Sequence, residues 1–166
     1  ENGGIFLHSN PWTMIAETLN GNGDRAHEYY RQINPVGKND KIDEFECSPY
    51  VYPQNILGDE HPQFGLARNS WLSGTASWCY QAATKYMLGI KPCYEGLELN
   101  PVIPHHWEGF KVKRVFRGNV YDIVVKNPGR ISEGIKNIKV NGQDIEGRIL
   151  PLGINEQYSV EVEMGA

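Results

Sequence analysis

The residues best suited to chemistry lie between Tyr50 and Tyr80, where aromatic rings alternate with polar side chains. The rings belong to Tyr50, Tyr52, Phe64, Trp71 and Trp78, and the hydrogen-bonding groups to Gln54, Asn55, Asp59, Glu60, His61, Arg68, Asn69, Ser70, Ser73 and Thr75. Apolar rings that cover C–H faces, together with amides that bind hydroxyls, are typical of a sugar site. A long ordered loop that caps a core has a similar composition, so both interpretations stay open.

A possible anion site follows in the same stretch. Ser73, Gly74 and Thr75 come directly before a predicted helix that runs from Ala76 to Leu88. The first N–H groups of a helix lack partners within the helix, and the helix dipole favours negative charge there. A small residue lets an anion approach these groups. An ordinary Ser or Thr cap has the same sequence, so the motif alone is a weak indication.

Four segments, taken in order, identify a family. They are ENGGIF with His8, YVYPQN, RNSWLSGTASW, and GIKPCYEGLELNPVIPHHWEGFKVKRVFRGNVYDIVVKNP. Together they resemble the inverting cellobiose and chitobiose phosphorylases of glycoside hydrolase family 94. The resemblance covers Glu1 to Pro128, whereas Gly129–Ala166 resembles the family only in being rich in strands.

The resemblance implies a longer enzyme with an N-terminal β-sandwich, a helical linker, an (α/α)6 barrel and a C-terminal β domain. We therefore expect an α+β chain. Residues 1–92 would supply the last barrel helices and a long active-site loop, and residues 93–166 a C-terminal antiparallel β-sandwich. Because the chain begins inside a motif, we expect it to be the C-terminal part of the enzyme. Its partner would be the remaining N-terminal part, and the parent is expected to be a cytoplasmic homodimer.

The resemblance also implies roles for single residues. His8 matches the family's phosphate-binding histidine, and Ser73 with Gly74 matches its Thr-Gly pair, with Ser in place of Thr. Thr75 is the alternative if the register differs by two positions. Gln54 matches a glutamine that contacts the glucosyl residue to be transferred. The general acid, an aspartate, and a phosphate-binding arginine are expected upstream, so no residue of this chain is predicted to be catalytic.

An inverting phosphorylase uses one carboxylic acid to protonate the glycosidic oxygen, and phosphate replaces the activated water of an inverting hydrolase. We expect the parent to cleave a β-linked glucose disaccharide such as cellobiose to α-glucose 1-phosphate and glucose, with this chain inactive alone. Phosphate is then a substrate, and no cofactor is expected. Alternatives are a chitobiose, cellodextrin or β-1,2-glucan phosphorylase, a hydrolase or glucan-processing domain, and a non-catalytic carbohydrate-binding module.

Other charged groups give weaker indications. Asp59, Glu60 and His61 are adjacent, but their spacing is not a known ligand pattern, so no metal site is predicted. His105-His106 is expected at the surface or at a domain interface. The net charge of -4 provides no basic field for nucleic acid, and no apolar run approaches a membrane span. The chain has an odd number of cysteines, Cys47, Cys79 and Cys93, which argues against a disulfide framework. We expect them to be reduced thiols.

The elements that would position these residues can also be predicted. A helix is expected from Asn10, with Pro11 in its first turn and an apolar face of Trp12, Ile15, Ala16 and Leu19. A second helix, capped by Asp24, should run to about Gln32. The prolines and glycines of the next stretch predict a long ordered loop between Asn34 and Leu72.

After Gly89 the pattern changes to that of strands. A short strand is expected at Gly96–Asn100, and a hairpin pairs Phe110–Phe116 with Val120–Val125 through a turn at Arg117-Gly118-Asn119. Further strands are expected at residues 138–140 and 160–162, with a turn at Asn141-Gly142. The alternating Lys and Glu residues indicate a solvated face of the sheet.

Overall fold

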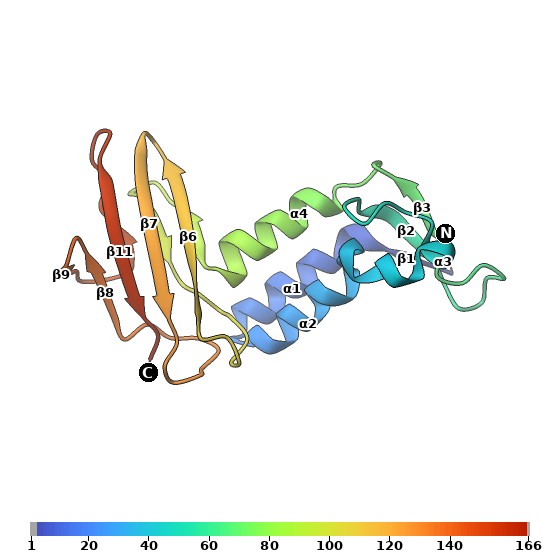
Figure 1. The fold of residues 1–166 in the computed structure, drawn as a ribbon, viewed down its shortest axis with the longest axis horizontal. Helices are drawn as coiled ribbons and strands as arrows, with labels where there is room; N and C mark the ends of the chain where they lie inside the picture. The colour runs from blue at the N-terminus through green and yellow to red at the C-terminus, as the bar shows by residue number, and fades with distance from the viewer. Residues whose placement is uncertain (1–2, 166) are drawn as a thin grey trace.

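The computed structural model describes residues 3–165, so Glu1 and Asn2 of the ENGGIF motif, and Ala166, lie outside the described residues. Figure 1 shows an elongated molecule in three parts. A small sheet lies at the end that carries the N-terminus, helices occupy the middle, and a larger β region carries the C-terminus. The chain is therefore a mixed α+β structure, as expected. None of the helices described for residues 3–165 has the length and apolar character needed to span a membrane.

Helices α1 (Asn10–Leu19) and α2 (Gly23–Ile33) lie side by side in the middle of the molecule (Figure 1). The apolar face predicted for α1 is largely uncovered in the structure. Trp12 and Leu19 are 50% and 69% exposed, whereas Met14 is fully buried. Met14 packs with Cys79 and Ala82. These two residues lie in the helix that follows Ser73, and this helix covers that side of α1. The helix that packs against α1, and not the spacing of apolar residues within α1, therefore decides which side of α1 is buried.

The stretch between Asn34 and Leu72 contains regular structure, so the prediction of a loop there is wrong. Its elements are the 3-10 segment η2 (Pro35–Lys41), helix α3 (Ile42–Phe45), and strands β2 (Pro53–Leu57) and β3 (Ala67–Ser70). β2 is the central strand between β1 (Gly4–Phe6) and β3. Pro53 is compatible with this sheet because it is the first residue of β2, a position at which proline is accepted.

The helix predicted after Ser73 is present and has two segments. α4 (Thr75–Gln81) continues into the π-helical segment η3 (Ala82–Met87). Gly89 follows with φ of +65°, a left-handed conformation that favours glycine after a helix. A Cβ at Gly89 would also collide with the carbonyl group of Asn100. The helical part and the β region are thus joined by a turn that only glycine fits well.

The β region contains two sheets. The smaller has the order β10-β5-β4, formed by Ile149–Leu150, Leu97–Leu99 and Ile90–Pro92. The larger has the order β6-β7-β11-β8-β9, formed by Gly109–Phe116, Asn119–Lys126, Gln157–Glu163, Asn137–Val140 and Gln143–Asp144. The predicted hairpin is confirmed as the antiparallel pair β6–β7, and strands are found at both further predicted positions.

One part of the sheet prediction is wrong, because the β region is not wholly antiparallel. β11 pairs with β7 in parallel, with Gln157 opposite Val120 and Glu163 opposite Lys126. Residues 127–156 connect the two strands, and this length allows the crossover that a parallel pair requires. The alternation of apolar and polar residues along a strand is the same for both directions, so the sequence pattern could not distinguish them.

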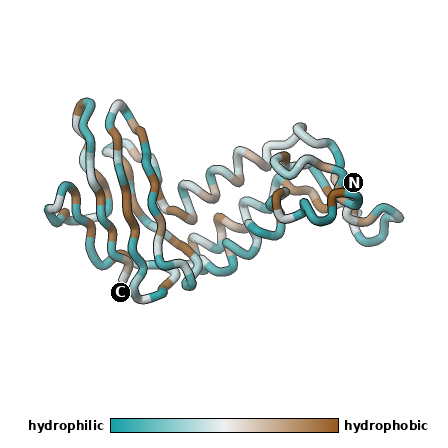
Figure 2. Tube along the Cα trace, in the orientation of Figure 1, coloured by the Kyte–Doolittle hydropathy of each residue, from teal (hydrophilic) through white to brown (hydrophobic). Residues whose placement is uncertain are grey.

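The two sheets share a single apolar core. Leu97 and Leu99 of the smaller sheet belong to the same buried cluster as Tyr121, Ile123 and Val160 of the larger one. Hydrophobic stretches follow the strands of the larger sheet in Figure 2.

The other face of the larger sheet carries exposed ion pairs. Lys126 lies 3.0 Å from Glu161, and Lys113 lies 3.6 Å from Asp122. The prediction of a solvated face is confirmed.

Candidate active site

His8 lies on a short 3-10 turn, η1 (Leu7–Ser9), between β1 and α1. The fully buried Leu7 fixes this turn in the structure. The Ser9 hydroxyl and the Asn10 amide donate hydrogen bonds of 3.2 and 3.0 Å to the Phe6 carbonyl oxygen. These local bonds give the Phe6 carbonyl group its hydrogen-bond partners where the strand changes into a helix, and they hold His8 at this junction.

Two aromatic rings orient the His8 imidazole. Phe6 stacks parallel to it at a centroid distance of 6.0 Å, and Trp12 meets it edge-on at 5.7 Å. Trp12 in turn contacts Trp78 of α4 edge-on at 5.7 Å. Stacked and edge-to-face pairs at these distances are favourable. The half-buried His8 ring is therefore held in a defined position by side chains from β1, α1 and α4.

Gly74 lies directly against the His8 ring. A Cβ built on Gly74 would stand 2.9 Å from Nδ1 and 3.1 Å from Nε2 of the imidazole. Real Cβ atoms are rarely so close to other atoms, so the ring and a side chain at position 74 compete for one space. The structure thus brings His8 and Gly74 together, although 66 positions separate them in the chain (74 − 8).

Ser73 lies directly before Gly74, the N-cap residue of α4. Its hydroxyl oxygen accepts a 3.0 Å hydrogen bond from the Thr75 N–H and lies 2.5 Å from the Thr75 hydroxyl. Thr75 is fully buried, whereas Ser73 is partly exposed. When the Thr75 hydroxyl donates to Ser73, the Ser73 proton is free to bind an anion. Thr75 itself has no exposed surface, so the burial favours Ser73 over Thr75 as a ligand-binding residue.

Gln54 lies on β2, half-buried, in the middle strand of the small sheet. Its side-chain oxygen accepts a 2.9 Å hydrogen bond from the amide of Asn69. This bond leaves the Gln54 NH₂ group available as a donor. Asn69 adopts φ of +53° on β3, a left-handed conformation that asparagine tolerates better than most residues. Asn69 therefore orients Gln54, a role that the sequence analysis missed.

The elements that carry these residues lie next to one another. β2 packs against η1, and η1 packs against α4. Phe6, two residues before His8, pairs with Asn55, the residue after Gln54. The turn that bears His8 thus contacts both the strand of Gln54 and the helix that begins after Ser73-Gly74.

A buried polar cluster lies beneath this region. Burial raises the pKa of the Cys79 thiol to about 11, and burial together with the neighbouring Cys79 and Tyr30 raises the pKa of the Tyr52 hydroxyl well above its usual value. Cys79 is 2% exposed and packs with Met14 and Ala82. Both groups are therefore neutral near pH 7 and support the site as packed side chains, without acting as acids or bases.

The carboxylates nearest in sequence lie in the turn after β2. Asp59, Glu60 and His61 are exposed, and the Nδ1 atom of His61 accepts a 3.0 Å hydrogen bond from the Gln63 N–H. Glu60 and His61 line a cavity of about 270 Å³ together with residues of β1 and β2, including Asn55. Exposed groups in this setting are not arranged as a paired acid and base.

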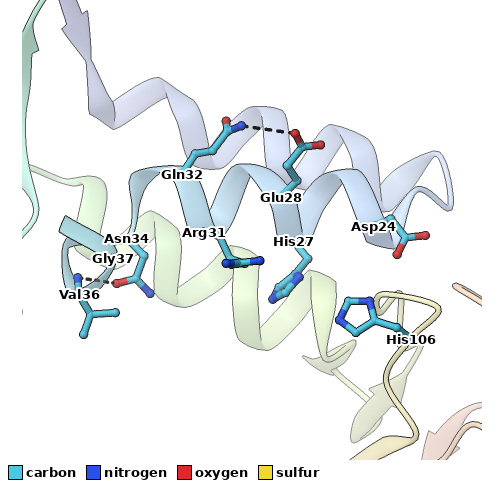
Figure 3. A pocket seen from close by; sticks show the side chains of 9 residues that line it. All are labelled: Asp24, His27, Glu28, Arg31, Gln32, Asn34, Val36, Gly37 and His106. Carbon is cyan, nitrogen blue, oxygen red and sulfur yellow. Dashed lines mark hydrogen bonds between the residues drawn. The ribbon is translucent and has the colours of Figure 1, made fainter. Parts of the chain in front are cut away.

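A larger cavity, of about 530 Å³, lies elsewhere (Figure 3). Its lining comes from α2, the following 3-10 segment and the turn after Pro104, and it includes Asp24, His27, Arg31 and His106. None of His8, Gln54, Ser73 and Gly74 lines it. The residues singled out in the sequence analysis and this cavity therefore belong to different places on the molecule.

Several residues at the site had no distinct signal in the sequence. Phe6 and Trp12 orient His8, yet aromatic residues in these positions also fit a core. Asn69 had a weak signal, because Asn next to Ser is common in turns that need a left-handed residue. Only the tertiary contacts distinguish these roles from ordinary packing.

Comparison with known proteins identifies the family. The family description "Glycosyl hydrolase 94 superfamily, catalytic domain" matches residues 1–89. The chain belongs to this superfamily. The matched region ends at Gly89, where the helical part ends in the structure.

Individual relatives extend the similarity to nearly the whole chain. An N,N'-diacetylchitobiose phosphorylase of Vibrio proteolyticus is 45% identical over 165 residues, which cover 99% of this chain and 21% of the relative. A solabiose phosphorylase of Paenibacillus borealis is 33% identical over 99% of this chain and 22% of its own length. A cyclic beta-(1,2)-glucan synthase NdvB of Rhizobium meliloti is 27% identical over 83% of this chain and 5% of its own length.

The two phosphorylases are much longer than this chain. It spans about a fifth of the length of the two phosphorylases. Both alignments also continue past Pro128, so the similarity extends further than the sequence motifs alone indicated.

Proposed function

We propose that this chain is the C-terminal part of an inverting disaccharide phosphorylase, a hexosyltransferase, and that His8, Ser73 and Gly74 bind phosphate. The observation that carries the proposal is the packing of His8 against Gly74 at the start of α4. An imidazole N–H, a serine hydroxyl and the first N–H groups of a helix are donors that suit an anion. A hydrolase, which uses water as the nucleophile, has no need of such a group of donors.

In the proposed reaction, phosphate attacks the anomeric carbon of the glycosyl residue while the glycosidic C–O bond breaks. An aspartic acid from the upstream part protonates the departing oxygen, and the configuration at the anomeric carbon is inverted. His8 and Ser73 hold the phosphate on the face of the sugar opposite the leaving group. Gln54 donates its NH₂ to a hydroxyl of the transferred residue. Phosphate is consumed as a substrate, and the reaction needs no cofactor.

The proposal includes the architecture of the complete enzyme. Residues 1–92 would complete an (α/α)6 barrel, and residues 93–166 would form a C-terminal β-sandwich. The exposure of Trp12 and Leu19 supports the first part, because upstream helices could cover this apolar side of α1. The single core shared by the two sheets supports the second. A cytoplasmic homodimer remains part of the proposal.

The disaccharide is proposed from two different arguments. The stretch YPQNILGDEHPQFGLARNSW led us to expect cellobiose. The 45% identity with an N,N'-diacetylchitobiose phosphorylase favours a disaccharide of N-acetylglucosamine instead. Both are β-linked disaccharides of gluco-configured sugars, so the proposed chemistry is the same. The difference lies in the space and hydrogen bonds available at the 2-position of the sugar.

The test is an assay of the complete protein in the synthetic direction. α-Glucose 1-phosphate and N-acetyl-α-glucosamine 1-phosphate serve as donors, each with glucose, N-acetylglucosamine or cellobiose as acceptor. We expect phosphate release that depends on both donor and acceptor, and the preferred pair identifies the disaccharide. Disaccharide cleavage at the same rate with and without phosphate would instead establish a hydrolase. Sugar binding without turnover in either direction would favour a carbohydrate-binding module.

A β-1,2-glucan phosphorylase is the second candidate, because the chain is 27% identical to the cyclic β-(1,2)-glucan synthase. It predicts phosphate release with β-1,2-linked glucose chains as acceptors and none with single sugars. The same assay, extended by a β-1,2-glucan acceptor, separates the two functions.

A further inference from the structure

A cluster of two histidines and one aspartate lies where the helical part meets the β region. Asp24 is in the first turn of α2, and His105 and His106 lie in the turn that follows Pro104. One side-chain donor atom from each of the three lies within 4.8 Å of the others. Within residues 3–165, this is the group found to have the composition and spacing of a metal site.

Asp24 and His105 are already in contact. The sequence predicts that Asp24 caps α2, and this prediction is wrong. The Asp24 carboxylate instead binds His105. The His105 Nδ1 atom lies 2.8 Å from both carboxylate oxygens, and the His105 N–H donates a 3.1 Å hydrogen bond to Oδ1. The Ser132 hydroxyl lies 3.4 Å from the other carboxylate oxygen. Asp24 is thus fixed by two segments of the β region.

The backbone on both sides of the cluster is buried and packed. Gly23 lies so close to Ile103 that a Cβ there would collide with the Ile103 carbonyl group. Ile103 is itself fully buried in the β core, and its N–H donates a 2.9 Å hydrogen bond to the Ser132 carbonyl oxygen. The Trp107 N–H closes the turn through a 3.0 Å bond to the Pro104 carbonyl oxygen. The three side chains therefore project from a rigid frame, which lowers the entropy lost on binding.

His106 completes the cluster on the side of the 530 Å³ cavity. Figure 3 shows the His27 and His106 rings next to each other among the residues that line this cavity, with Asp24 one turn of α2 before His27. The His27 and His106 ring centroids are 5.9 Å apart, and the His27 ring also meets Trp107 edge-on at 5.3 Å. Because Asp24, His105 and His106 are exposed, water can reach the cluster and supply further ligands.

We propose that Asp24, His105 and His106 bind a divalent transition-metal ion of the zinc class, which links the first turn of α2 to the segment that leads into β6. Two imidazoles and one carboxylate suit Zn²⁺ and its neighbours Co²⁺ and Ni²⁺, whereas Mg²⁺ prefers oxygen ligands. The carboxylate supplies negative charge, and water fills the remaining position. On binding, the metal replaces the hydrogen bond between His105 and Asp24, and the Nδ1 proton of His105 moves to Nε2 or to solvent.

The location gives this site a structural consequence. Asp24 and His8 lie at opposite ends of the helices, since η1 precedes α1 and Asp24 starts the antiparallel helix α2 (Figure 1). The metal would therefore not touch the proposed phosphate site. It would stabilise the contact between the helical part and the β region, because an ion that binds only the folded state raises stability. This inference goes beyond the proposed phosphorylase function and does not depend on it.

The test is metal binding by the complete protein, purified without a histidine tag and stripped with a chelator. Zn²⁺ is titrated by calorimetry, and Co²⁺ by its visible absorption. We expect one saturable equivalent that His106→Ala and Asp24→Asn weaken at least tenfold. His61→Ala, which removes an exposed histidine elsewhere, should leave this equivalent unchanged.

Thermal unfolding provides a second measurement that needs no enzyme activity. Zn²⁺ should raise the melting temperature of the wild-type protein and of His61→Ala, but not that of His106→Ala, whereas Mg²⁺ should have no effect. Circular dichroism checks that the variants fold, and the exposure of all three side chains makes folding the expected result. If His106→Ala binds Zn²⁺ as tightly as the wild type, or if no saturable equivalent is found, the proposal is wrong.

Discussion

The imidazole ring of His8 occupies the space that a side chain at Gly74 would need. A Cβ there would lie 2.9 Å from Nδ1 and 3.1 Å from Nε2 of His8. The glycine of the Ser73-Gly74 pair thus has a packing function that is independent of any bound anion. His8 and the start of α4 behave as one unit, and changes at either residue should affect the other.

Gly74→Ala should therefore destabilise the protein and displace His8. The added methyl group overpacks the contact, which costs about 1–3 kcal/mol. Thermal unfolding measures this loss. Gly37→Ala is the matched control, because a Cβ at Gly37 has only an ordinary contact of 3.6 Å with the Arg31 carbonyl oxygen. In the background of His8→Ala the cost of Gly74→Ala should shrink, since the ring is absent. Equal costs in both backgrounds would show that the two residues are not coupled.

His8→Ala in the complete enzyme should weaken phosphate binding. Loss of a charge-assisted hydrogen bond costs about 1.5–3 kcal/mol, or roughly one to two orders of magnitude in the phosphate KM. Steady-state kinetics at varied phosphate concentrations measure this change, and loss of a contact made only in the transition state would lower kcat instead. His61→Ala serves as the control. A normal phosphate response with a lower melting temperature would make His8 a packing residue.

Asn69→Gly should weaken sugar binding without affecting phosphate. Glycine keeps the left-handed backbone of position 69, where φ is +53°, but removes the amide that donates to Gln54. A neutral hydrogen bond contributes about 0.5–1.5 kcal/mol, so the KM for the disaccharide should rise roughly two- to tenfold. Asn69→Ala should add a loss of stability from backbone strain. An unchanged disaccharide KM in Asn69→Gly would show that Gln54 does not need this partner.

The stability of the helical part should fall as the pH rises from about 9 to about 11. Burial raises the pKa of the Cys79 thiol from its ordinary 9.0 to about 11. The folded state therefore keeps the thiol neutral, and this contribution is fully present below pH 9. Above pH 9 the unfolded chain loses the proton first, so stability decreases until the folded thiol also ionises. The loss is about 2–3 kcal/mol from this group.

Thermal unfolding across this pH range tests the effect. Cys79→Ala should be less stable at neutral pH because it leaves a cavity, but its stability should depend less on pH between 9 and 11. Above pH 10 the stability of the variant should still fall as the pH rises, because burial also raises the pKa of Tyr52. A variant with the same slope as the wild type would show that Cys79 ionises normally in the folded state.

Local patterns in the sequence predicted much of the secondary structure correctly. The β6–β7 hairpin follows from alternating residues on both sides of a turn at Arg117-Gly118, and the helix after Ser73 follows from the small polar residues before it and its ending glycine. These features depend on neighbours in the chain, so they can be read without knowing the fold. The succession of motifs likewise indicated the family that comparison later showed.

Other features depend on partners that are distant in sequence. The direction of β11 beside β7 and the buried side of α1 are set by packing, because the same residue pattern satisfies either arrangement. The strand that begins at Pro53 exists because β1 and β3 lie on either side of it.

The functional sites show the same division. Residue types suggested His8, Gln54, Ser73 and Gly74, but the contact of His8 with Gly74 became visible only in three dimensions. Asp24 and His105 are 81 positions apart, and no local pattern relates them. They meet because Gly23 packs against the backbone of the buried Ile103. The sequence determined which groups were available, and close packing of distant segments decided which of them met.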